Sequence, residues 1–457
     1  MLASIVGISE DEATEKLNCT VVITYSQSGE LLAQELRAQL ERTIRVAEYG
    51  VCDLEVVIGG APVTTVANRL YVTVTNDAAV ISASPGIASS PPVPVHGLQT
   101  MVAACFTAGA VLRRVIPGLP GTDSDPCIIR FDALGAGRAL LERTITLDDA
   151  VLIGAGAVGN GFLRAARHLD INGILTVADP KTVGGGNPNR CIYFDTDDVG
   201  LPKATRLAQK AQSDFPSLTL EPAEISFTDL VNQRGRVKRA IVATDSRRVR
   251  RSIQKCLPVE VVDASTTDVS EIIAHSHRQP TDGACLACIY REVPDELARA
   301  RDIASGLGIA LEDVTENDLI NPGIAAKIVE HHPTLDASAL VGTAFDSLFK
   351  QLCAEQALLS PTGKQVLAPF AFVSNLAGAL LALELVRFDA GHEIRRSNYL
   401  CLSPWYPPHS KIRSWRGRVS DCEFCGNPRS FLALGRVWPE FLSFLRPDNG
   451  ASGDIAP

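Results

Sequence analysis

The sequence predicts an α/β protein whose largest part is a doubly wound, Rossmann-like domain. Between Asp149 and Ser265, apolar segments of strand length alternate with helical segments, which is typical of a parallel sheet covered on both faces. The glycine-rich segment 154–159 stands where the first of these strands meets the first helix. Residues 1–140 mix helical and strand patterns, which indicates a further α/β domain before the main one.

The alternation assigns each element of the main domain in order. Apolar, β-branched runs predict the strands, and segments with polar residues on one face predict the helices. The expected strands are 150–156, 174–180, 219–225, 239–245 and 259–265, and the expected helices between them are 158–170, 202–215 and 246–257.

Length and composition define the class of protein. With 457 residues, the chain is long enough for about three compact units. Its 46% hydrophobic and 21% charged residues are typical of a globular, soluble protein and not of a disordered one. The 43 basic and 52 acidic residues leave a net charge of −9, so we do not expect a general nucleic-acid binder.

The N-terminus and the most apolar segments argue against export and membrane insertion. The first residues carry acids where a signal peptide has bases. Two apolar stretches, 98–117 and 366–388, contain or adjoin charged residues, so we interpret them as buried helices. We therefore expect a cytoplasmic protein without a membrane span.

Four segments follow from these patterns: an N-terminal α/β domain at 1–140, the main domain at 141–430, an insertion within it at 289–365, and a C-terminal tail at 431–457. The N-terminal domain ends in a long apolar helix similar to the one near the end of the main domain. This similarity suggests two related halves, although two independent buried helices explain the pattern equally well.

A glycine fingerprint and its acidic partner predict an adenine-nucleotide site. Gly154, Gly156 and Gly159 permit a tight turn and let the backbone approach phosphate at a helix N-terminus. Asp179 ends the next strand, 20 residues beyond Gly159, where a carboxylate accepts hydrogen bonds from ribose hydroxyls. The alternative is a glycine-rich turn that binds nothing.

Polar and cationic residues follow, and they suit a triphosphate better than a hydride carrier. The loop beyond the ribose carboxylate presents Asn187, Asn189 and Arg190, and Lys203 begins the next helix. Fixed cations stabilise the charge that develops when an α-phosphate is attacked. Asp245, at the end of the fourth strand, offers a carboxylate for Mg²⁺. Taken singly, Arg190 and Lys203 would be ordinary solvated charges.

Four of the twelve cysteines form two CxxC pairs that predict a zinc site. Cys285 and Cys288 make one pair and Cys422 and Cys425 the other, 134 positions further along. Four thiolates are the ligand set of a closed, tetrahedral Zn²⁺ site. Such a site is structural, and we expect it to staple the base of the insertion to the main domain. A redox role lacks a thioredoxin-like context.

The histidines carry no prediction of chemistry. His275, His277, His331 and His332 lack the carboxylate spacing that indicates a metal site or an acid–base pair, so we expect solvated or capping side chains.

Together, these motifs resemble the E1-like adenylating enzymes, a family that includes the ThiF and MoeB proteins and the ubiquitin-activating E1 enzymes. The resemblance covers about residues 145–430. It rests on the following residues: GAGAVG at 154–159, Asp179, the N-x-x-R segment Asn187-Pro188-Asn189-Arg190, Lys203 in the segment Pro202-Lys203-Ala204, Thr244-Asp245 and the split cysteine pairs. Cys191 departs from the family, in which a Gln commonly follows the Arg.

The resemblance implies ATP and Mg²⁺ as ligands and a ubiquitin-like protein as substrate, whose C-terminal glycine would be activated as an acyl-adenylate. Cys353, between Lys350 and Lys364, stands in a place comparable to that of the E1 cysteine that accepts the ubiquitin-like protein as a thioester. The alternative is a helix-face cysteine without chemistry. An E2-like protein and a second copy of the chain, forming a homodimer, are the further partners that we expect.

The N-terminal domain lacks a GxGxxG segment, so the resemblance implies a degenerate, inactive adenylation half, as in the pseudo-symmetric E1 enzymes. This organisation fits the E1 of a bacterial ubiquitin-like conjugation system. Three alternatives remain. The first is a sulfur-carrier activator of the ThiF or MoeB kind. The second is an NAD-dependent oxidoreductase, which would leave Arg190, Lys203 and the CxxC pairs unexplained. The third is a non-catalytic scaffold.

Overall fold

The structure is a computed structural model. It describes residues 2, 6, 10–86, 94–121, 125–267, 269–291, 296–315, 317, 320–341, 343, 345, 348–349, 352, 370–391, 397–409 and 411–440. Cys353 therefore lies outside the described residues.

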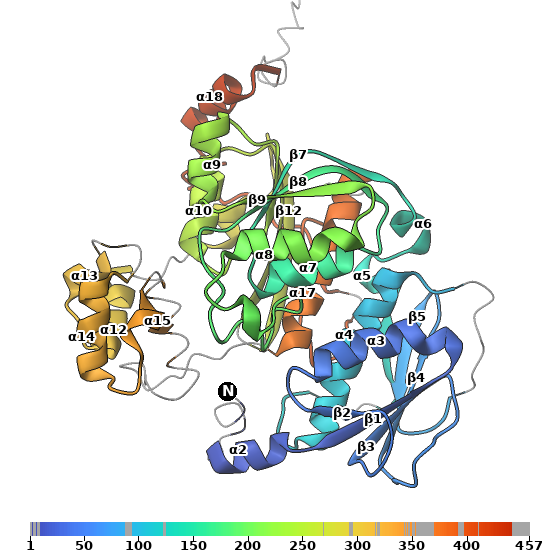
Figure 1. The fold of residues 1–457 in the computed structure, drawn as a ribbon. Coiled ribbons are helices and arrows are strands. Elements are labelled where there is room, and N and C mark those ends of the chain that lie inside the picture. The colour runs from blue at the N-terminus through green and yellow to red at the C-terminus, as the bar shows by residue number, and fades with distance from the viewer. Residues whose placement is uncertain are drawn as a thin grey trace, which may run out of the picture.

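An eight-stranded sheet forms the centre of the main domain (Figure 1). Its order is β14-β13-β12-β11-β10-β7-β8-β9. The strands β7 to β11 pair in parallel, and β12, β13 and β14 extend the sheet in antiparallel pairs. Their bounds are β7 (Ile145–Ile153), β8 (Ile171–Ala178), β9 (Leu218–Ala223), β10 (Arg239–Val242), β11 (Glu260–Thr267), β12 (Glu271–Arg278), β13 (Tyr399–Leu402) and β14 (Arg413–Ser414).

Helices cover both faces of this sheet, which confirms the doubly wound α/β class. One face packs in a common core with α7 (Ala157–Ala166), α8 (Lys203–Ala211) and α17 (Ala371–Asp389). A second core joins the other face to α9 (Phe227–Arg234), α10 (Arg247–Lys255) and α11 (Leu286–Ile289). The five strands and three helices expected between 150 and 265 are all present, with ends that differ by a few residues.

The N-terminal domain has a six-stranded sheet of order β2-β1-β3-β4-β5-β6. Strands β1 to β4 pair in parallel, and β5 and β6 are antiparallel. The strands are β1 (Thr20–Tyr25), β2 (Arg45–Ala47), β3 (Leu54–Ile58), β4 (Arg69–Val74), β5 (Ala78–Ser82) and β6 (Cys127–Arg130), and the helices are α2 (Glu10–Leu17), α3 (Glu30–Leu40), α4 (Gly97–Val115), α5 (Phe131–Leu134) and α6 (Arg138–Leu141).

The two sheets share one topology. The order and directions of β2-β1-β3-β4-β5-β6 match those of β8-β7-β10-β11-β12-β13 in the main domain. In each half, a helix follows the first strand (α3 or α7), and a 19-residue apolar helix precedes the last matched strand (α4 or α17). The N-terminal domain is therefore a reduced version of the main-domain topology.

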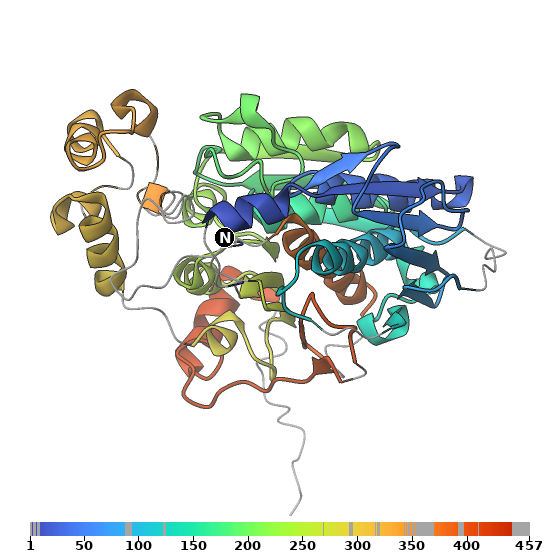
Figure 2. The same ribbon diagram turned by 90° about the horizontal axis from the view of Figure 1, so that it is seen from below.

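The two halves meet through these four helices, which lie between the sheets (Figures 1 and 2). Glu35 of α3 is fully buried there, and its carboxylate pairs with Arg164 at 3.1 Å and with Arg167, both at the end of α7. Burial alone would raise the pKa of Glu35, but the His168 hydrogen bond and the two arginine charges lower it to about 2. The carboxylate is therefore ionised at neutral pH. The stability that its ion pairs contribute to the folded protein is lost only as the pH falls through the folded-state pKa.

The insertion folds as a separate group of helices, beside the main body in both views (Figures 1 and 2). Its helices are α12 (Glu296–Leu307), α13 (Leu311–Thr315), α14 (Pro322–His331) and α15 (Ala337–Leu340). Leu307, Ile328 and Phe349 belong to a hydrophobic cluster of their own. The insertion thus adds a small core without entering the main one.

Two further features of the main domain concern its C-terminal helix and the apolar helix α17. The helix α18 (Pro428–Val437) crosses the position where we expected the tail to begin, and Trp438 donates from its indole nitrogen to the Leu257 carbonyl at 2.9 Å. The helix α17 is long and apolar enough to cross a membrane, but 94% of its most apolar 18-residue window is buried inside the protein.

The crossing of α7 and α17 leaves no room for a side chain, which makes Gly378 a test of the fold. A Cβ at Gly378 would collide with the Gly161 carbonyl carbon and the Phe162 nitrogen, both backbone atoms. We expect Gly378→Ala to lower the free energy of unfolding by about 1–3 kcal/mol, measured by urea denaturation. Gly137→Ala is the control, because a Cβ there meets no atom within 4 Å. Equal midpoints for the two variants would contradict this packing.

Candidate functional site

The glycine loop lies at the carboxyl end of β7. Gly154 has a φ of +103°, and a Cβ there would come within 2.9 Å of the Ala243 carbonyl oxygen, so another residue would be strained and crowded. A Cβ at Gly159 would collide with the Gly154 carbonyl. Gly156 is different, because a Cβ there would meet no atom within 4 Å. The loop is therefore tightly packed at Gly154 and Gly159, whereas the space next to Gly156 is open, as a site for close phosphate approach requires.

Asp179 follows β8 directly and closes the other side of the loop. The residue is 8% exposed, and its carboxylate accepts hydrogen bonds from the Ala155 amide at 2.8 Å and the Lys181 amide at 2.9 Å. Each carboxylate oxygen keeps a lone pair for a further donor. The geometry leaves Asp179 able to accept from ribose hydroxyls next to the glycine loop.

The loop that carries Arg190 is folded by its own asparagine. Asn187 accepts from the Gly184 amide at 2.8 Å through its side chain, and its carbonyl accepts from the amides of Arg190 and Cys191. The Arg190 guanidinium is half-buried and donates to the Gly186 carbonyl at 3.1 Å. Asn189 is exposed. These turns hold Arg190 at the border of the loop, with donors left for an anion.

Lys203 is a buried cation at the start of α8. Its backbone amide donates to the Lys181 carbonyl at 2.9 Å, which ties α8 to the residues after β8. The residue is 8% exposed, and burial lowers the pKa of its ammonium group even though the Asp179 and Asp245 carboxylates act in the opposite direction. A desolvated ammonium in this position is suited to binding a polyphosphate, which replaces the lost hydration.

Asp245 lies on the connection from β10 to α10 and is exposed. The carbonyl of its neighbour Thr244 accepts at 2.5 Å from Arg250, a fully buried arginine that forms an ion pair with Asp263. Tyr290 donates to the same Asp263 carboxylate at 2.7 Å. This network fixes the backbone beside Asp245 while its carboxylate faces solvent, where a divalent cation can be bound.

Asn160 is a residue that the sequence analysis missed. It is fully buried on α7, and its amide nitrogen donates to the carbonyls of Ala155 at 3.1 Å and Gly156 at 3.0 Å. Its side-chain oxygen accepts from the Tyr193 amide at 3.1 Å. Asn160 therefore joins the glycine loop to the Arg190 loop. The signal available in the sequence was a polar residue directly after the last fingerprint glycine.

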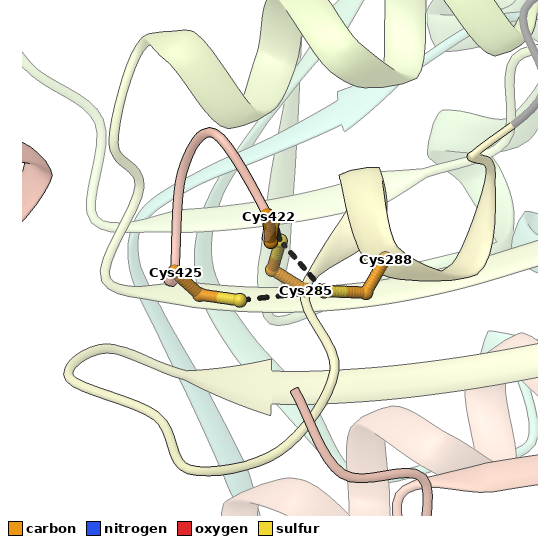
Figure 3. A group of neighbouring side chains, drawn as sticks. All are labelled: Cys285, Cys288, Cys422 and Cys425. Carbon is orange, nitrogen blue, oxygen red and sulfur yellow. Dashed lines mark hydrogen bonds between the residues drawn. The ribbon is translucent and has the colours of Figure 1, made fainter. Parts of the chain in front are cut away.

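The four cysteines of the two CxxC pairs converge, as Figure 3 shows, and all their Sγ atoms lie within 4.8 Å of one another. The measured Sγ–Sγ distances are 3.8 Å between Cys285 and Cys288, 3.7 Å between Cys285 and Cys422, and 3.3 Å between Cys288 and Cys425. A tetrahedral zinc–thiolate site has sulfur atoms about 3.8 Å apart. The donor set and its spacing fit Zn²⁺.

Backbone pairing brings together the two CxxC segments, 285–288 and 422–425, which we call the cysteine knuckles. The Ala284 amide donates to the Arg416 carbonyl at 2.8 Å, and the Arg418 amide donates to the Asp282 carbonyl at 3.1 Å. A further amide, that of Val419, points at the Cys288 sulfur at 3.4 Å. Such N–H···S contacts stabilise thiolates at metal sites.

Two of the histidine expectations were wrong. His275 and His277 are fully buried on β12, an interior strand between β11 and β13, and are neither solvated nor capping. His275 contacts the Ala284 carbonyl at 2.8 Å through Nε2, next to the first cysteine knuckle. Burial lowers the pKa of His275 to about 4, so its ring is neutral at physiological pH.

Comparisons with known proteins bear on both domains. Residues 1–137 match the family model of the E1 N-terminal domain, and residues 137–423 match the model of the ThiF family. The uncharacterized protein y4jF of Sinorhizobium fredii (strain NBRC 101917 / NGR234) is 28% identical over 350 residues, which cover 70% of this chain and 67% of that protein.

Solved structures of E. coli MccB are also similar. The complex with ATP has 14% identity and a TM-score of 0.38, covering 63% of this chain and 68% of that one. The complex with MccA-N7isoASN has 15% identity and a TM-score of 0.36, covering 64% and 71%.

The ThiF match covers more than half of the sequence and contains the glycine loop, Asp179, Lys203 and three of the four cysteines, Cys285, Cys288 and Cys422. The chain thus belongs to the ThiF family, as an E1-like member with an E1 N-terminal domain.

Proposed function

We propose that this protein uses ATP to adenylate the C-terminal glycine of a ubiquitin-like protein and then accepts the acyl group on Cys353 as a thioester. The observation that carries the adenylation step is the buried Lys203 ammonium beside Asp179 and the glycine loop, with Asp245 acting on the same charge. A buried cation at this position suits a triphosphate, whereas hydride transfer has no use for it.

Each residue would have a separate task. Asp179 would accept from the ribose, and the backbone at Gly156 would approach the phosphates. Arg190 and Lys203 would stabilise the charge on the α-phosphate, and Asp245 would hold Mg²⁺. The glycine carboxylate is already ionised and attacks the α-phosphorus, the bond to the bridging oxygen breaks, and pyrophosphate leaves. Orientation and electrostatic stabilisation supply this catalysis without a general base.

In the second step, the Cys353 thiolate would attack the carbonyl carbon of the acyl-adenylate, and AMP would leave. The helical insertion around 289–365 supports this step, because it adds a separate small core in the part of the chain that precedes this cysteine. An E2-like protein would then take the acyl group by thioester exchange.

The N-terminal domain would be an inactive adenylation half. The matching strand order of the two sheets supports this proposal. At the position of the glycine loop, β1 is followed by Ser26, Gln27, Ser28 and Gly29, which lack the fingerprint. A bacterial ubiquitin-like conjugation system in the cytoplasm remains the setting that we propose, with boundaries near 140 and 430 for the two domains.

The nucleotide site is tested first, by thermal unfolding with ATP·Mg²⁺ and with NAD⁺. Ligand at about 100 times its Kd stabilises the native state by about 2.7 kcal/mol. We expect ATP·Mg²⁺ to raise Tm and NAD⁺ to leave it unchanged. In Asp245→Ala, most of the rise with ATP·Mg²⁺ should be lost. Asp197→Ala, which removes another exposed carboxylate, should keep it. Stabilisation by NAD⁺ but not by ATP would reject the proposal.

The division between the two steps is tested with Cys353→Ala. We expect this variant to retain pyrophosphate exchange with ubiquitin-like proteins of the same genome and to lose the thiol-sensitive adduct on non-reducing gels, because only the second step needs the sulfur. Cys52→Ala, at a half-buried cysteine of the N-terminal domain, should retain both activities. A thiocarboxylate product without any adduct would instead indicate a sulfur-carrier activator.

The four-cysteine site predicts about one zinc per chain, measured by metal analysis of the purified protein. Cys422→Ala should lose the metal and lower Tm, because the two knuckles are then no longer cross-linked. Cys401→Ala, at a cysteine outside the cluster, should keep the metal. A metal-free protein with unchanged Tm in Cys422→Ala would show that the cluster needs no zinc.

A further inference from the structure

The turn that follows α3 in the N-terminal domain reaches the Arg190 loop of the main domain. Arg42 lies in this turn, and its guanidinium is half-buried. One terminal nitrogen donates to the carbonyls of Pro188 at 2.5 Å and Phe194 at 2.9 Å. The other donates to the Ile192 carbonyl at 2.9 Å. One side chain therefore holds three carbonyls, about 150 positions away in sequence.

These three carbonyls span the segment that contains Arg190. Pro188 and Phe194 are buried, so their carbonyls have little access to water and would lose a partner if the guanidinium were removed. A planar guanidinium can serve several acceptors at fixed angles, whereas a lysine ammonium is a point charge that cannot reproduce the fork. The chemistry at this position is therefore specific to arginine.

The same loop is held from the other side by the nucleotide-binding helix. Asn160, on α7, accepts from the Tyr193 amide while its amide group donates to the glycine loop. Arg42 and Asn160 thus fix successive residues of one segment, one from each domain. Glu35, on α3, adds a second link through its ion pairs with Arg164 on α7 and with Arg167 directly after α7.

We propose that Arg42 is a positioning residue, through which the N-terminal domain presents Arg190 to the nucleotide. This inference rests on the proposed ATP site. The terminal nitrogens of Arg42 donate to protein carbonyls, so it acts through the loop and not by contact with phosphate. An otherwise inactive half of the chain thereby supports nucleotide binding in the active half.

The test compares Arg42→Ala and Arg42→Lys with Arg37→Ala. Arg37 lies on α3, the helix that leads into this turn, and forms an exposed ion pair with Glu41 at 3.3 Å, so its loss controls for a missing charge on this surface. The Kd of ATP·Mg²⁺ is measured by calorimetry, and exchange of the backbone amides of 186–194 is followed by mass spectrometry without nucleotide.

We expect Arg42→Ala to raise the Kd for ATP·Mg²⁺ roughly tenfold, as loss of charge-assisted hydrogen bonds to one loop implies. Amides of 186–194 should exchange faster, and Arg42→Lys should recover little of either property because it restores charge without the fork. Arg37→Ala should match the wild type in both measurements.

Two results would overturn the inference. A lower Tm in the Arg42 variants with an unchanged Kd would make Arg42 a purely structural residue. If Arg42→Ala does not fold, the Kd of Arg42→Lys for ATP·Mg²⁺ is compared with that of the wild type instead, because this variant keeps the stem and the charge. A wild-type protein that binds no ATP would instead reject the proposed function, and with it the assignment of Arg42 to nucleotide binding.

Discussion

The site depends on one constraint, the register of the parallel strands β7, β8 and β10. Ile153 pairs with both Ala178 and Val242, so the three strands end together. Their next residues are therefore the glycine loop, Asp179 and the connection to Asp245. Because the carboxyl ends of parallel strands meet at one edge, residues from three distant parts of the chain lie along a single edge of the sheet. A shift by one residue in any of these strands would turn their side chains to the opposite face and remove that edge.

The second requirement is a close approach between helices that only glycine allows. A Cβ at Gly161 would come within 2.7 Å of the Ser374 carbonyl oxygen on α17. This crossing fixes α7, whose N-terminus adjoins the glycine loop, against the 19-residue apolar helix α17. The matched helices α3 and α4 of the N-terminal domain pack onto the same pair. The two related halves thus share one hydrophobic core, and the position of the glycine loop depends on both of them.

The sequence was sufficient to predict the features that depend on local patterns. Strand–helix alternation, the glycine fingerprint, Asp179 and the CxxC pairs each have a fixed spacing, and the structure brings the four cysteines together. Contacts that depend on tertiary packing could not be predicted. Nothing near Arg42 in the sequence indicates that it binds carbonyls of residues 188–194. His275 and His277 were misassigned because their burial depends on the residues that cover their face of β12; His275, for example, contacts the Ala284 carbonyl beside the first cysteine pair.

The cysteine cluster explains how the insertion can be accommodated without disturbing this edge. Cys288 precedes the insertion, and Cys422 follows α17, β13 and β14, so the whole segment is closed by the backbone pairing of 282–284 with 416–418. A cross-link between points so far apart in the chain removes more conformational freedom from the unfolded state than a local one does. The knuckle also continues into Tyr290, which helps Asp263 hold Arg250 and thus the Thr244 carbonyl. The insertion therefore begins directly after a base that is itself connected to the backbone beside Asp245.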